Sequence, residues 1–319
     1  MTTLLADIGG THARVALDTA DGPVHPEKFR AADFAALQDV LAAYCAQYKL
    51  PSGGRVAIGT AAHPDENGVW WFQNLNEWGI DPTALRAAGW DVPVLVNDFV
   101  ASSCGAVTIP ATQLTTLRVG AADNGIRHVV LGPGTGLGLG FVEKIADRWH
   151  VQETLGGHMF GASATDEQFM VSKVVRRLRG GDMMFIHEDV CSGVGLPVLY
   201  RAVCLCNGQP VAYDSAADLL MNKDDKMMAA ALRLFHEFLG LYTHNALVTG
   251  HAFGGVYLDG GLTQHLVARG VFDFETFLKF MTMEPAVVVR QKIDATPIHI
   301  INDPFVALHG LSALVKYHD

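Results

Sequence analysis

Two glycine-rich runs constrain this chain more than any other feature, because each lies between apolar segments of the kind that form β-strands. The first is Asp-Ile-Gly-Gly-Thr over residues 7–11, and the second is Gly-Pro-Gly-Thr-Gly over residues 132–136. A glycine and threonine turn can bring backbone N–H groups and a hydroxyl against phosphate oxygens, because no Cβ blocks the approach. One such turn also serves as an ordinary hairpin connection. Two in one chain favour a nucleotide that is held from both sides.

The composition of the chain excludes several classes of partner. With 319 residues, half of them hydrophobic, the chain is long for one core and of ordinary length for two lobes. Its formal net charge of −10 disfavours nucleic acid and an anionic membrane surface, so we expect a small-molecule partner. The N-terminus lacks the pattern of a signal peptide, which predicts a cytoplasmic protein. Five cysteines without paired CxxC spacing are expected to be reduced thiols.

Predicted strands and helices alternate along the chain, which is typical of an α/β fold. Short apolar runs at 55–59 and 92–96 predict buried strands, and the second ends in Asn97 and Asp98. Open α/β sheets bind ligands at the carboxyl ends of their strands, so this polar pair is a candidate site.

Three helices are predicted from their polar starts and apolar periodicity. Asp33 is expected to cap a helix that follows it, and Thr165 with Gln168 forms the pattern of a capping box. The apolar stretch 226–248 contains Arg233, so a buried helix is expected there rather than a membrane span.

Taken together, these motifs resemble those of the bacterial glucokinases, within the superfamily that also contains hexokinases, actin and heat-shock ATPases. The resemblance covers nearly the whole chain and keeps the order of the family's motifs. The zinc cluster of the related repressor and kinase family is absent from the sequence. The matching segments are 7–14 (first phosphate motif), 96–99 (catalytic and sugar motif), 132–138 (second phosphate motif), 156–158 and 188–193 (sugar contacts), 254–261 (adenosine motif) and 302–310 (closing helix).

The resemblance implies an α/β protein with a two-lobed actin-like ATPase fold, in which ribonuclease H-like sheets flank a nucleotide and sugar cleft between the lobes. A small lobe is expected over residues 1–103, rejoined by the C-terminal helix at about 301–319. A large lobe is expected over residues 104–300. A homodimer is expected only by analogy with the family.

The same resemblance implies ATP and Mg²⁺ as cofactors. It places Asp7 near the metal, where the carboxylate would act through a bound water, since Mg²⁺ usually keeps several waters. Arg14 offers charge to the phosphates, or forms a surface salt bridge instead, and His12 stands where the family usually has Asn. The implied nucleotide-binding residues are Asp7, Gly9, Gly10, Thr11, Gly134, Thr135, Gly136, Gly260 and Gly261.

Phosphoryl transfer to a sugar needs a carboxylate that takes the proton of the attacking hydroxyl. The resemblance assigns this role to Asp98 and a sugar contact to Asn97, although the pair also fits a plain turn or helix cap. His158 and Glu188 are the implied sugar clamps, while a histidine after two glycines is by itself more often structural. Asn74 resembles the Asn of an Asn-x-x-Trp loop in the family, with a spacing one residue longer.

Leu155 departs from the family pattern. Family members carry a glutamate directly before Gly-Gly-His, and that glutamate contacts ring hydroxyls of the sugar. In this chain Glu153 is the nearest acid, two residues earlier. Three alternatives follow: a glucokinase of weak affinity, a kinase for another hexose, or a site completed by Glu153 through a loop shift. A non-catalytic sugar or nucleotide sensor on the same fold is the alternative outside the enzymes.

Overall fold

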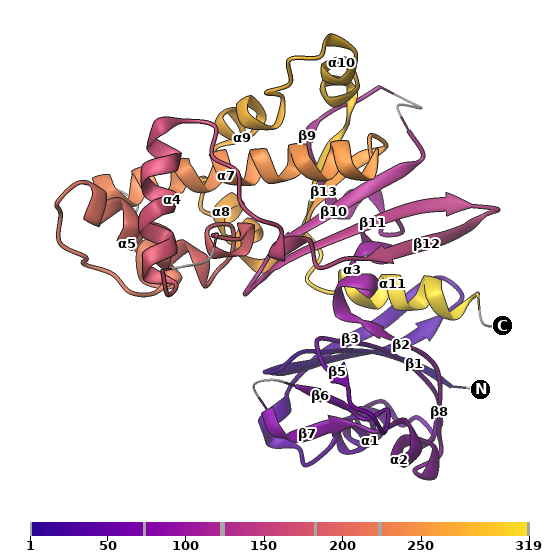
Figure 1. The fold of residues 1–319 in the computed structure, drawn as a ribbon. Helices are drawn as coiled ribbons and strands as arrows, with labels where there is room; N and C mark the ends of the chain where they lie inside the picture. The colour runs from indigo at the N-terminus through magenta and orange to yellow at the C-terminus, as the bar shows by residue number, and fades with distance from the viewer. Residues whose placement is uncertain (1, 73–74, 122–124, 182–183, 223–224, 318–319) are drawn as a thin grey trace. The chain divides into compact units, whose positions relative to one another are not determined.

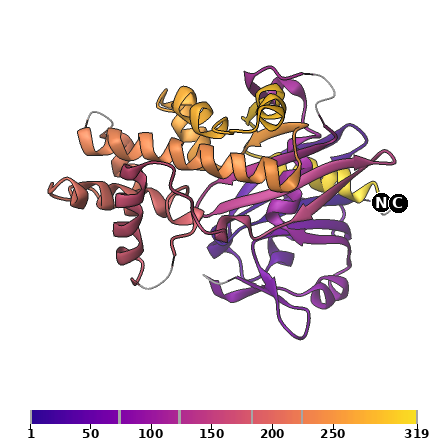
Figure 2. The same ribbon diagram turned by 45° about the horizontal axis from the view of Figure 1, so that its top comes forward.

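The computed structural model describes residues 2–72, 75–121, 125–181, 184–222 and 225–317. The chain divides into two compact units (Figures 1 and 2). Unit 1 comprises Met1–Ala111, Lys144–Glu153 and Asp303–Asp319, and unit 2 comprises Thr112–Glu143 and Thr154–Asn302. The hairpin segment at 144–153 therefore groups with the N-terminal part of the chain, which its position in the sequence does not indicate.

Unit 1 is built on a mixed five-stranded sheet with the order β3-β2-β1-β4-β8. Strands β5, β6 and β7 form a separate small antiparallel sheet. The elements of unit 1 are β1 (Thr3–Ile8), β2 (His12–Thr19), β3 (Gly22–Arg30), α1 (Leu37–Tyr48), β4 (Gly54–Thr60), β5 (His63–Pro64), β6 (Trp70–Phe72), β7 (Leu75–Ile80), α2 (Pro82–Ala87), β8 (Trp90–Asn97), α3 (Asp98–Ala106), β12 (Arg148–Glu153) and α11 (Val306–Val315).

The alternation of side chains along β1 explains why helices cover both faces of this sheet. Leu4 and Ala6 belong to the core shared with α1, whereas Leu5 belongs to the core shared with α3 and α11. Helices α3 and α11 pack closely because each carries a glycine at the crossing. A Cβ on Gly105 would lie 2.0 Å from the Val306 carbonyl oxygen, and one on Gly310 would lie 1.8 Å from that of Ala101.

Unit 2 contains most of a six-stranded sheet with the order β12-β11-β10-β13-β14-β9. Helix α7, the long helix labelled in Figure 1, is buried along most of its length in the largest hydrophobic core of the described residues. The elements are β9 (Leu114–Arg118), β10 (Arg127–Pro133), β11 (Leu137–Ile145), α4 (Asp166–Leu178), α5 (Gly195–Cys206), α6 (Ala216–Met221), α7 (Lys226–Gly250), β13 (Gly255–Leu258), α8 (Gly261–Ala268), α9 (Phe274–Met281), α10 (Val287–Ala295) and β14 (Ile298–Ile301).

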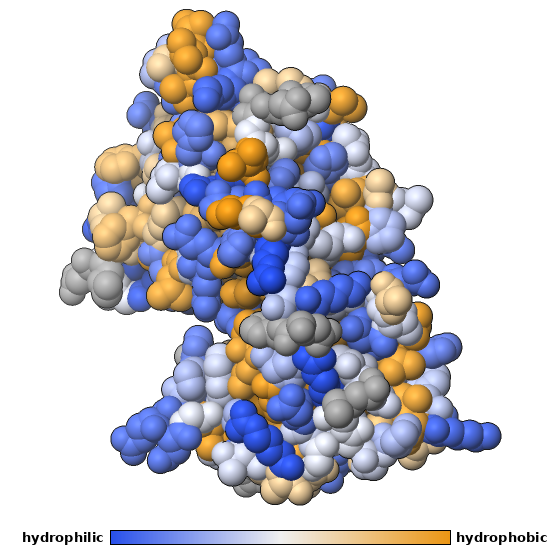
Figure 3. Space-filling view, turned by 90° about the vertical axis from the view of Figure 1, so that its right-hand side faces the viewer, coloured by the Kyte–Doolittle hydropathy of each residue, from blue (hydrophilic) through white to orange (hydrophobic). Residues whose placement is uncertain are grey.

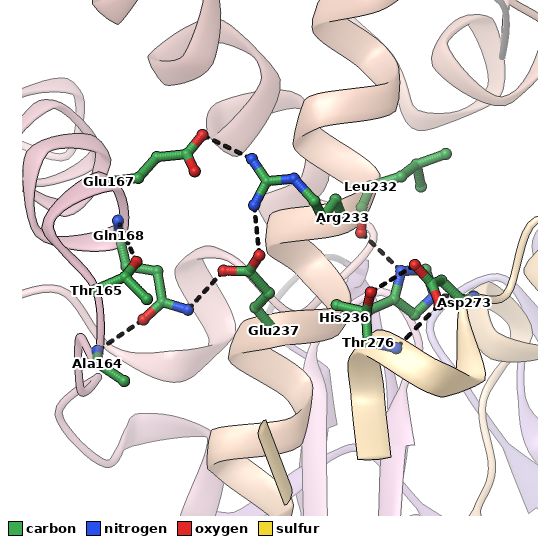
Figure 4. A network of polar contacts seen from close by, with 10 residues as sticks. All are labelled: Ala164, Thr165, Glu167, Gln168, Leu232, Arg233, His236, Glu237, Asp273 and Thr276. Atoms are coloured by element: carbon green, nitrogen blue, oxygen red, sulfur yellow. Dashed lines mark hydrogen bonds and ion pairs between the residues drawn. The ribbon is translucent and has the colours of Figure 1, made fainter. Parts of the chain in front are cut away.

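Helix α7 carries buried polar side chains that join it to α4 (Figure 4). The carboxylate of Glu237 accepts hydrogen bonds from Gln168 Nε2 at 2.7 Å and from Arg233, which also pairs with Glu167 at 2.7 Å. These partners satisfy a buried carboxylate that would otherwise be costly. The sequence prediction of a buried helix is thus confirmed, and none of the described helices is long and apolar enough to span a bilayer.

His236, one residue before Glu237, joins α7 to α9 (Figure 4). Its Nδ1 lies 2.7 Å from the Leu232 carbonyl oxygen, and its Nε2 accepts from the Asp273 amide at 3.2 Å. This arrangement requires a neutral ring that is protonated on Nδ1.

Two predicted helix starts have different outcomes. Thr165 caps α4, because its hydroxyl accepts from the Gln168 amide at 3.2 Å, while the Gln168 side chain accepts from the amide of Ala164. The prediction for Asp33 is wrong: it ends a short 3₁₀ turn, and α1 begins at Leu37. The first turn of α1 has its own carboxylate, since Asp39 accepts from the Ala36 amide.

Hydrophilic and hydrophobic side chains are interspersed on the molecular face that Figure 3 shows. Scattered apolar residues on a surface are normal for folded proteins.

Candidate active site

The carboxyl ends of three parallel strands meet at one edge of the unit 1 sheet. Strand β4 pairs with β1 on one side and with β8 on the other, so that Thr60 is the register partner of both Ile8 and Asn97. Adjacent strands are about 4.8 Å apart, so the backbones at Asp7 and Val96 are separated by roughly 10 Å. The tertiary structure of unit 1 thus brings Asp7 and Asn97 to the carboxyl edge of its sheet, where open α/β sheets bind ligands.

The first glycine turn connects β1 to β2. Its backbone closes through a hydrogen bond from the Gly9 amide to the His12 carbonyl oxygen at 2.9 Å, and Thr11 at its tip is exposed. A Cβ on Gly10 would have no neighbour within 4 Å, and one on Gly9 would make only an ordinary contact at 3.6 Å. Neither glycine has a positive φ. Packing within the described chain therefore does not require glycine at these two positions, and the absence of a Cβ leaves room for a close approach to the backbone.

Asp7 faces Arg14 across the hairpin. The two are register partners on β1 and β2, and Arg14 Nη1 donates to Asp7 Oδ2 at 2.7 Å. Burial raises the pKa of the Asp7 carboxyl above its ordinary value, and the neighbouring guanidinium lowers it in opposition. Arg14 was expected either to offer charge to the phosphates or to form a surface salt bridge. The structure contains a salt bridge, and its partner Asp7 is buried.

Asn97 and Asp98 stand at the junction of β8 and α3. The Oδ1 atom of Asn97 accepts from the Phe99 amide at 2.8 Å, so Asn97 is the N-cap residue and Asp98 is the first residue of the helix. This hydrogen bond occupies the side-chain oxygen of Asn97 and fixes the rotamer of the side chain. The side-chain amide nitrogen is then the group that can donate to a ligand. Asp98 is partly buried and comes directly after the N-cap residue.

The second glycine turn, between β10 and β11, lies against the start of helix α8. Gly260, the N-cap residue of α8, has a φ of +94°, and a Cβ there would lie 2.5 Å from the Pro133 carbonyl oxygen. Only glycine fits this close approach. The exposed Thr135 and the amide groups at the start of α8 consequently belong to one region of unit 2, where backbone N–H groups favour an anion.

Glu188 contacts this second turn directly. Its Oε2 atom accepts a hydrogen bond from the Leu137 amide at 2.8 Å. The segment that follows is tied to the same turn, because Gly193 donates to the Gly134 carbonyl oxygen at 2.7 Å and Val194 donates to that of Thr135 at 3.3 Å. A sugar-contact candidate and a phosphate-binding candidate are therefore joined within unit 2.

The Gly-Gly-His segment packs against the start of β11. A Cβ on Gly157 would lie 2.2 Å from the Leu137 carbonyl oxygen, so this close approach requires glycine. His158 ends a short 3₁₀ turn and is exposed, and Leu155 before it is 76% exposed. Asn74 lies outside the described residues.

A pocket of about 490 Å³ adjoins the second turn within unit 2. Gly193, which bonds to Gly134, lines one side, and Val194, Pro197, Arg201 and Ser215 line the rest, among others. Its lining combines apolar side chains with the charged groups of Arg179, Arg201 and Asp214.

Asp7 is the carboxylate that the sequence assigned to the metal. The described residues contain no group of three or more histidine, cysteine, aspartate or glutamate side chains that could hold a metal ion. A single carboxylate fits Mg²⁺ that is held mainly by nucleotide phosphates and waters, which is the usual arrangement for this ion.

The sequence analysis missed the role of the backbone at Leu137 and Gly193. The only local signal was the glycine at position 193, which was included in a sugar motif rather than linked to the turn. It also missed His187, whose buried ring lies 4.7 Å, centroid to centroid, from that of Tyr242. Both nitrogens of His187 and the Tyr242 hydroxyl lack a hydrogen-bond partner among the described residues.

Comparison with known proteins gives one consistent result. A family model described as Glucokinase matches residues 4–318. A glucokinase of Chelativorans sp. is 29% identical over 98% of this chain and 91% of its own length. A crystal structure of glucokinase from an Antarctic psychrotroph has a TM-score of 0.85, with 25% identity over 99% of both chains.

A more distant structure shares only the fold. A ROK family glucokinase from Streptomyces griseus, in complex with glucose and AMPPNP, has a TM-score of 0.63 and 14% identity over 99% of this chain and 100% of its own. The structural likeness confirms the actin-like ATPase fold that the sequence predicted.

Proposed function

Because the chain belongs to the glucokinase family and is thus a sugar kinase, we propose that it transfers the terminal phosphoryl group of ATP to the 6-hydroxyl of a hexose, with glucose as the first candidate. The observation that carries the proposal is the free space around Gly9, Gly10 and Gly134. Packing does not require glycine at these positions, whereas close contact of the backbone with a phosphate would require it. Gly134 resembles the other two, because a Cβ at this position would have no neighbour closer than 3.9 Å.

Asp98 is proposed as the base. The sugar oxygen attacks the terminal phosphorus, its proton passes to the Asp98 carboxylate, and the bond to the bridging oxygen breaks to release ADP. Asn97 would donate to a neighbouring sugar hydroxyl, with His158 and Glu188 binding further hydroxyls. A bound Mg²⁺ would neutralise charge on the phosphates, with Asp7 contacting it through water.

The phosphates would be bound by hydroxyl and backbone groups of the two turns. Thr11 and Thr135 are exposed at the turn tips, and the N-terminus of α8 at Gly260 and Gly261 favours negative charge. The adjoining pocket beside Gly193 would accept the nucleoside, since it opens next to the turn that would bind the phosphates.

We propose that glucose binds weakly and that changes at one ring hydroxyl are tolerated. The exposed Leu155 stands where the family has a glutamate, and an apolar contact discriminates between sugars by only about 1–3 kcal/mol. This supports a relaxed selection at that hydroxyl over strong selection for another hexose. A cytoplasmic location remains an expectation from the N-terminal sequence, and a homodimer remains an expectation from the family.

The test is a coupled assay of ADP release with a panel of hexoses and with ATP and Mg²⁺. We expect sugar-dependent turnover, with glucose among the substrates and with 2-deoxy or epimeric sugars accepted at comparable kcat/KM. Binding of sugar and of an ATP analogue without turnover of any hexose would instead identify a sensor. Absence of nucleotide binding would overturn the proposal.

A further inference from the structure

We propose that Glu188 is a positioning residue for the second glycine turn, so that sugar binding and nucleotide binding are coupled inside unit 2. The inference rests on the proposed function for the identity of the two ligands. It begins from the hydrogen bond between the Leu137 amide and Glu188 Oε2 at 2.8 Å, across 51 positions of the chain.

The geometry around Gly136 indicates how closely the carboxylate approaches the turn. A Cβ on Gly136 would lie 2.7 Å from Glu188 Oε2, and the other near atom is the Cδ of the same side chain at 3.4 Å. Gly136 has no positive φ, so its backbone could accept a side chain. The Glu188 carboxylate is therefore the group that a Cβ at this position would displace.

The main chain on both sides of this contact is fixed. Ser192 Oγ donates to the Glu188 carbonyl oxygen at 2.7 Å, and the Gly193 amide donates to the Gly134 carbonyl oxygen at 2.7 Å. The Glu188 side chain, partly exposed, is the part of this assembly that a ligand could still restrain.

The other sugar-contact segment, residues 156–158, packs on Leu137, the residue that donates to Glu188. Leu137 donates its amide to Glu188 and presents its carbonyl oxygen to Gly157, next to His158. The Thr154 hydroxyl donates to the Leu139 carbonyl oxygen at 2.6 Å, which holds the beginning of that segment to β11. Both segments assigned to the sugar thus meet the end of the phosphate-binding turn at one residue.

The coupling follows from the two oxygens of one carboxylate. A sugar hydroxyl that donates to Glu188 restrains the carboxylate in the position that also holds the Leu137 amide. Ordering of the turn by the first ligand then lowers the cost of ordering it for the second. Because such coupling is reciprocal, the nucleotide must strengthen sugar binding by the same factor.

Three variants separate this role from simple sugar contact. Glu188→Ala removes the acceptor, whereas Glu188→Gln keeps an oxygen that can accept from Leu137. Gly136→Ala keeps the Glu188 side chain but displaces its carboxylate from the turn, because the added Cβ would lie 2.7 Å from Glu188 Oε2. The matched control is His158→Ala, which removes a proposed sugar contact whose side chain is exposed.

Hydrogen exchange at the Leu137 amide measures the contact itself, without any ligand. We expect protection in the native chain, in Glu188→Gln and in His158→Ala, and faster exchange in Glu188→Ala and Gly136→Ala. Equal protection in native protein and Glu188→Ala, with unchanged thermal stability, would overturn the positioning role.

Calorimetry then measures the coupling, with glucose and with the Mg²⁺ complex of AMPPNP, each alone and together. Without sugar, Glu188→Ala should weaken AMPPNP by roughly 5- to 50-fold, and His158→Ala should leave it unchanged. Gly136→Ala should weaken glucose in the absence of nucleotide.

Native AMPPNP affinity in both Glu188→Ala and Gly136→Ala would overturn the inference while the kinase function stands. If the native chain binds neither ligand, the proposed function fails, and with it the coupling. The exchange of the Leu137 amide then still decides whether Glu188 holds the turn.

Discussion

Arg14 and Asp7 face each other across the first hairpin, with Arg14 Nη1 2.7 Å from Asp7 Oδ2. This pair stabilises a carboxylate that burial alone would protonate more readily. Arg14, which the sequence assigned to the phosphates, therefore also favours the ionised form of Asp7, the residue assigned to the metal.

Replacing Arg14 by methionine should raise the pKa of Asp7 further, because the opposing cation is lost while burial remains. If Asp7 must be ionised for activity, the acid limb of the kcat/KM profile should move to higher pH. Initial rates between pH 5 and 9 measure this, with the exposed Arg86→Met as the control. An unchanged acid limb would show that ionisation of Asp7 does not limit turnover.

Asp98→Asn should keep the fold and much of the sugar binding, while kcat falls by roughly 10²- to 10⁴-fold, because the proton acceptor is lost. Steady-state kinetics and thermal unfolding are measured on the same preparation. Near-normal turnover would refute the base assignment. A large loss of thermal stability would favour a structural role at the start of α3.

Gly9→Val and Gly134→Val should weaken binding of an ATP analogue and leave sugar binding intact, because a branched side chain fills the space proposed for phosphate. Gly260→Val is the contrasting variant, since a Cβ there meets the Pro133 carbonyl oxygen at 2.5 Å and should lower the stability of unit 2. Calorimetry and thermal unfolding distinguish the two effects. Unchanged nucleotide affinity in the first two variants would make these ordinary hairpin turns.

Leu155→Glu should tighten glucose, because a carboxylate that accepts from a sugar hydroxyl is worth roughly 1.5–3 kcal/mol, or about 10- to 150-fold in affinity. The kcat/KM values for glucose and for its 2-deoxy, 2-amino and epimeric relatives are compared in both forms. Glu153→Gln is the control for the alternative in which the neighbouring acid completes the site. Tight and selective use of glucose by the native chain, worsened by Leu155→Glu, would show that this position does not face the sugar.

The buried histidines predict a loss of stability in acid. Burial lowers the pKa of His187 and of His236 from an ordinary value of 6.5 to about 4, although a hydrogen bond to Leu232 and the charge of Asp273 oppose the shift at His236. Between these pH values the unfolded chain binds protons that the folded chain does not. The free energy of unfolding should therefore fall as the pH drops from 6.5 to 4, by at most about 1.4 kcal/mol per pH unit for each histidine.

Denaturant unfolding at pH 7 and pH 5 measures this slope. His187→Phe should reduce it, because the aromatic packing against Tyr242 remains while the titrating group is removed. The exposed His150→Gln should leave the slope unchanged. A native slope equal to that of His187→Phe would show that His187 does not titrate with unfolding.

The sequence by itself determined the features that depend on local chemistry. Apolar runs and a glycine turn specified the strands on either side of residues 9–11, and an apolar helical pattern interrupted by Arg233 specified a buried α7. Local reasoning was wrong at Asp33, where a 3₁₀ turn that hydrogen bonds to the first hairpin replaced the expected cap. The choice of cap there depended on a contact distant in sequence.

Only the tertiary structure decided which polar groups meet within each unit. The bond from Leu137 to Glu188 spans 51 positions, and the approach of Gly260 to Pro133 joins segments more than a hundred positions apart. Such contacts follow from the register of parallel strands and the packing of whole elements, because the chain returns to a sheet edge only after a complete crossover. The residues of the candidate site were therefore visible in the sequence, whereas the partners that orient them became visible only in the fold.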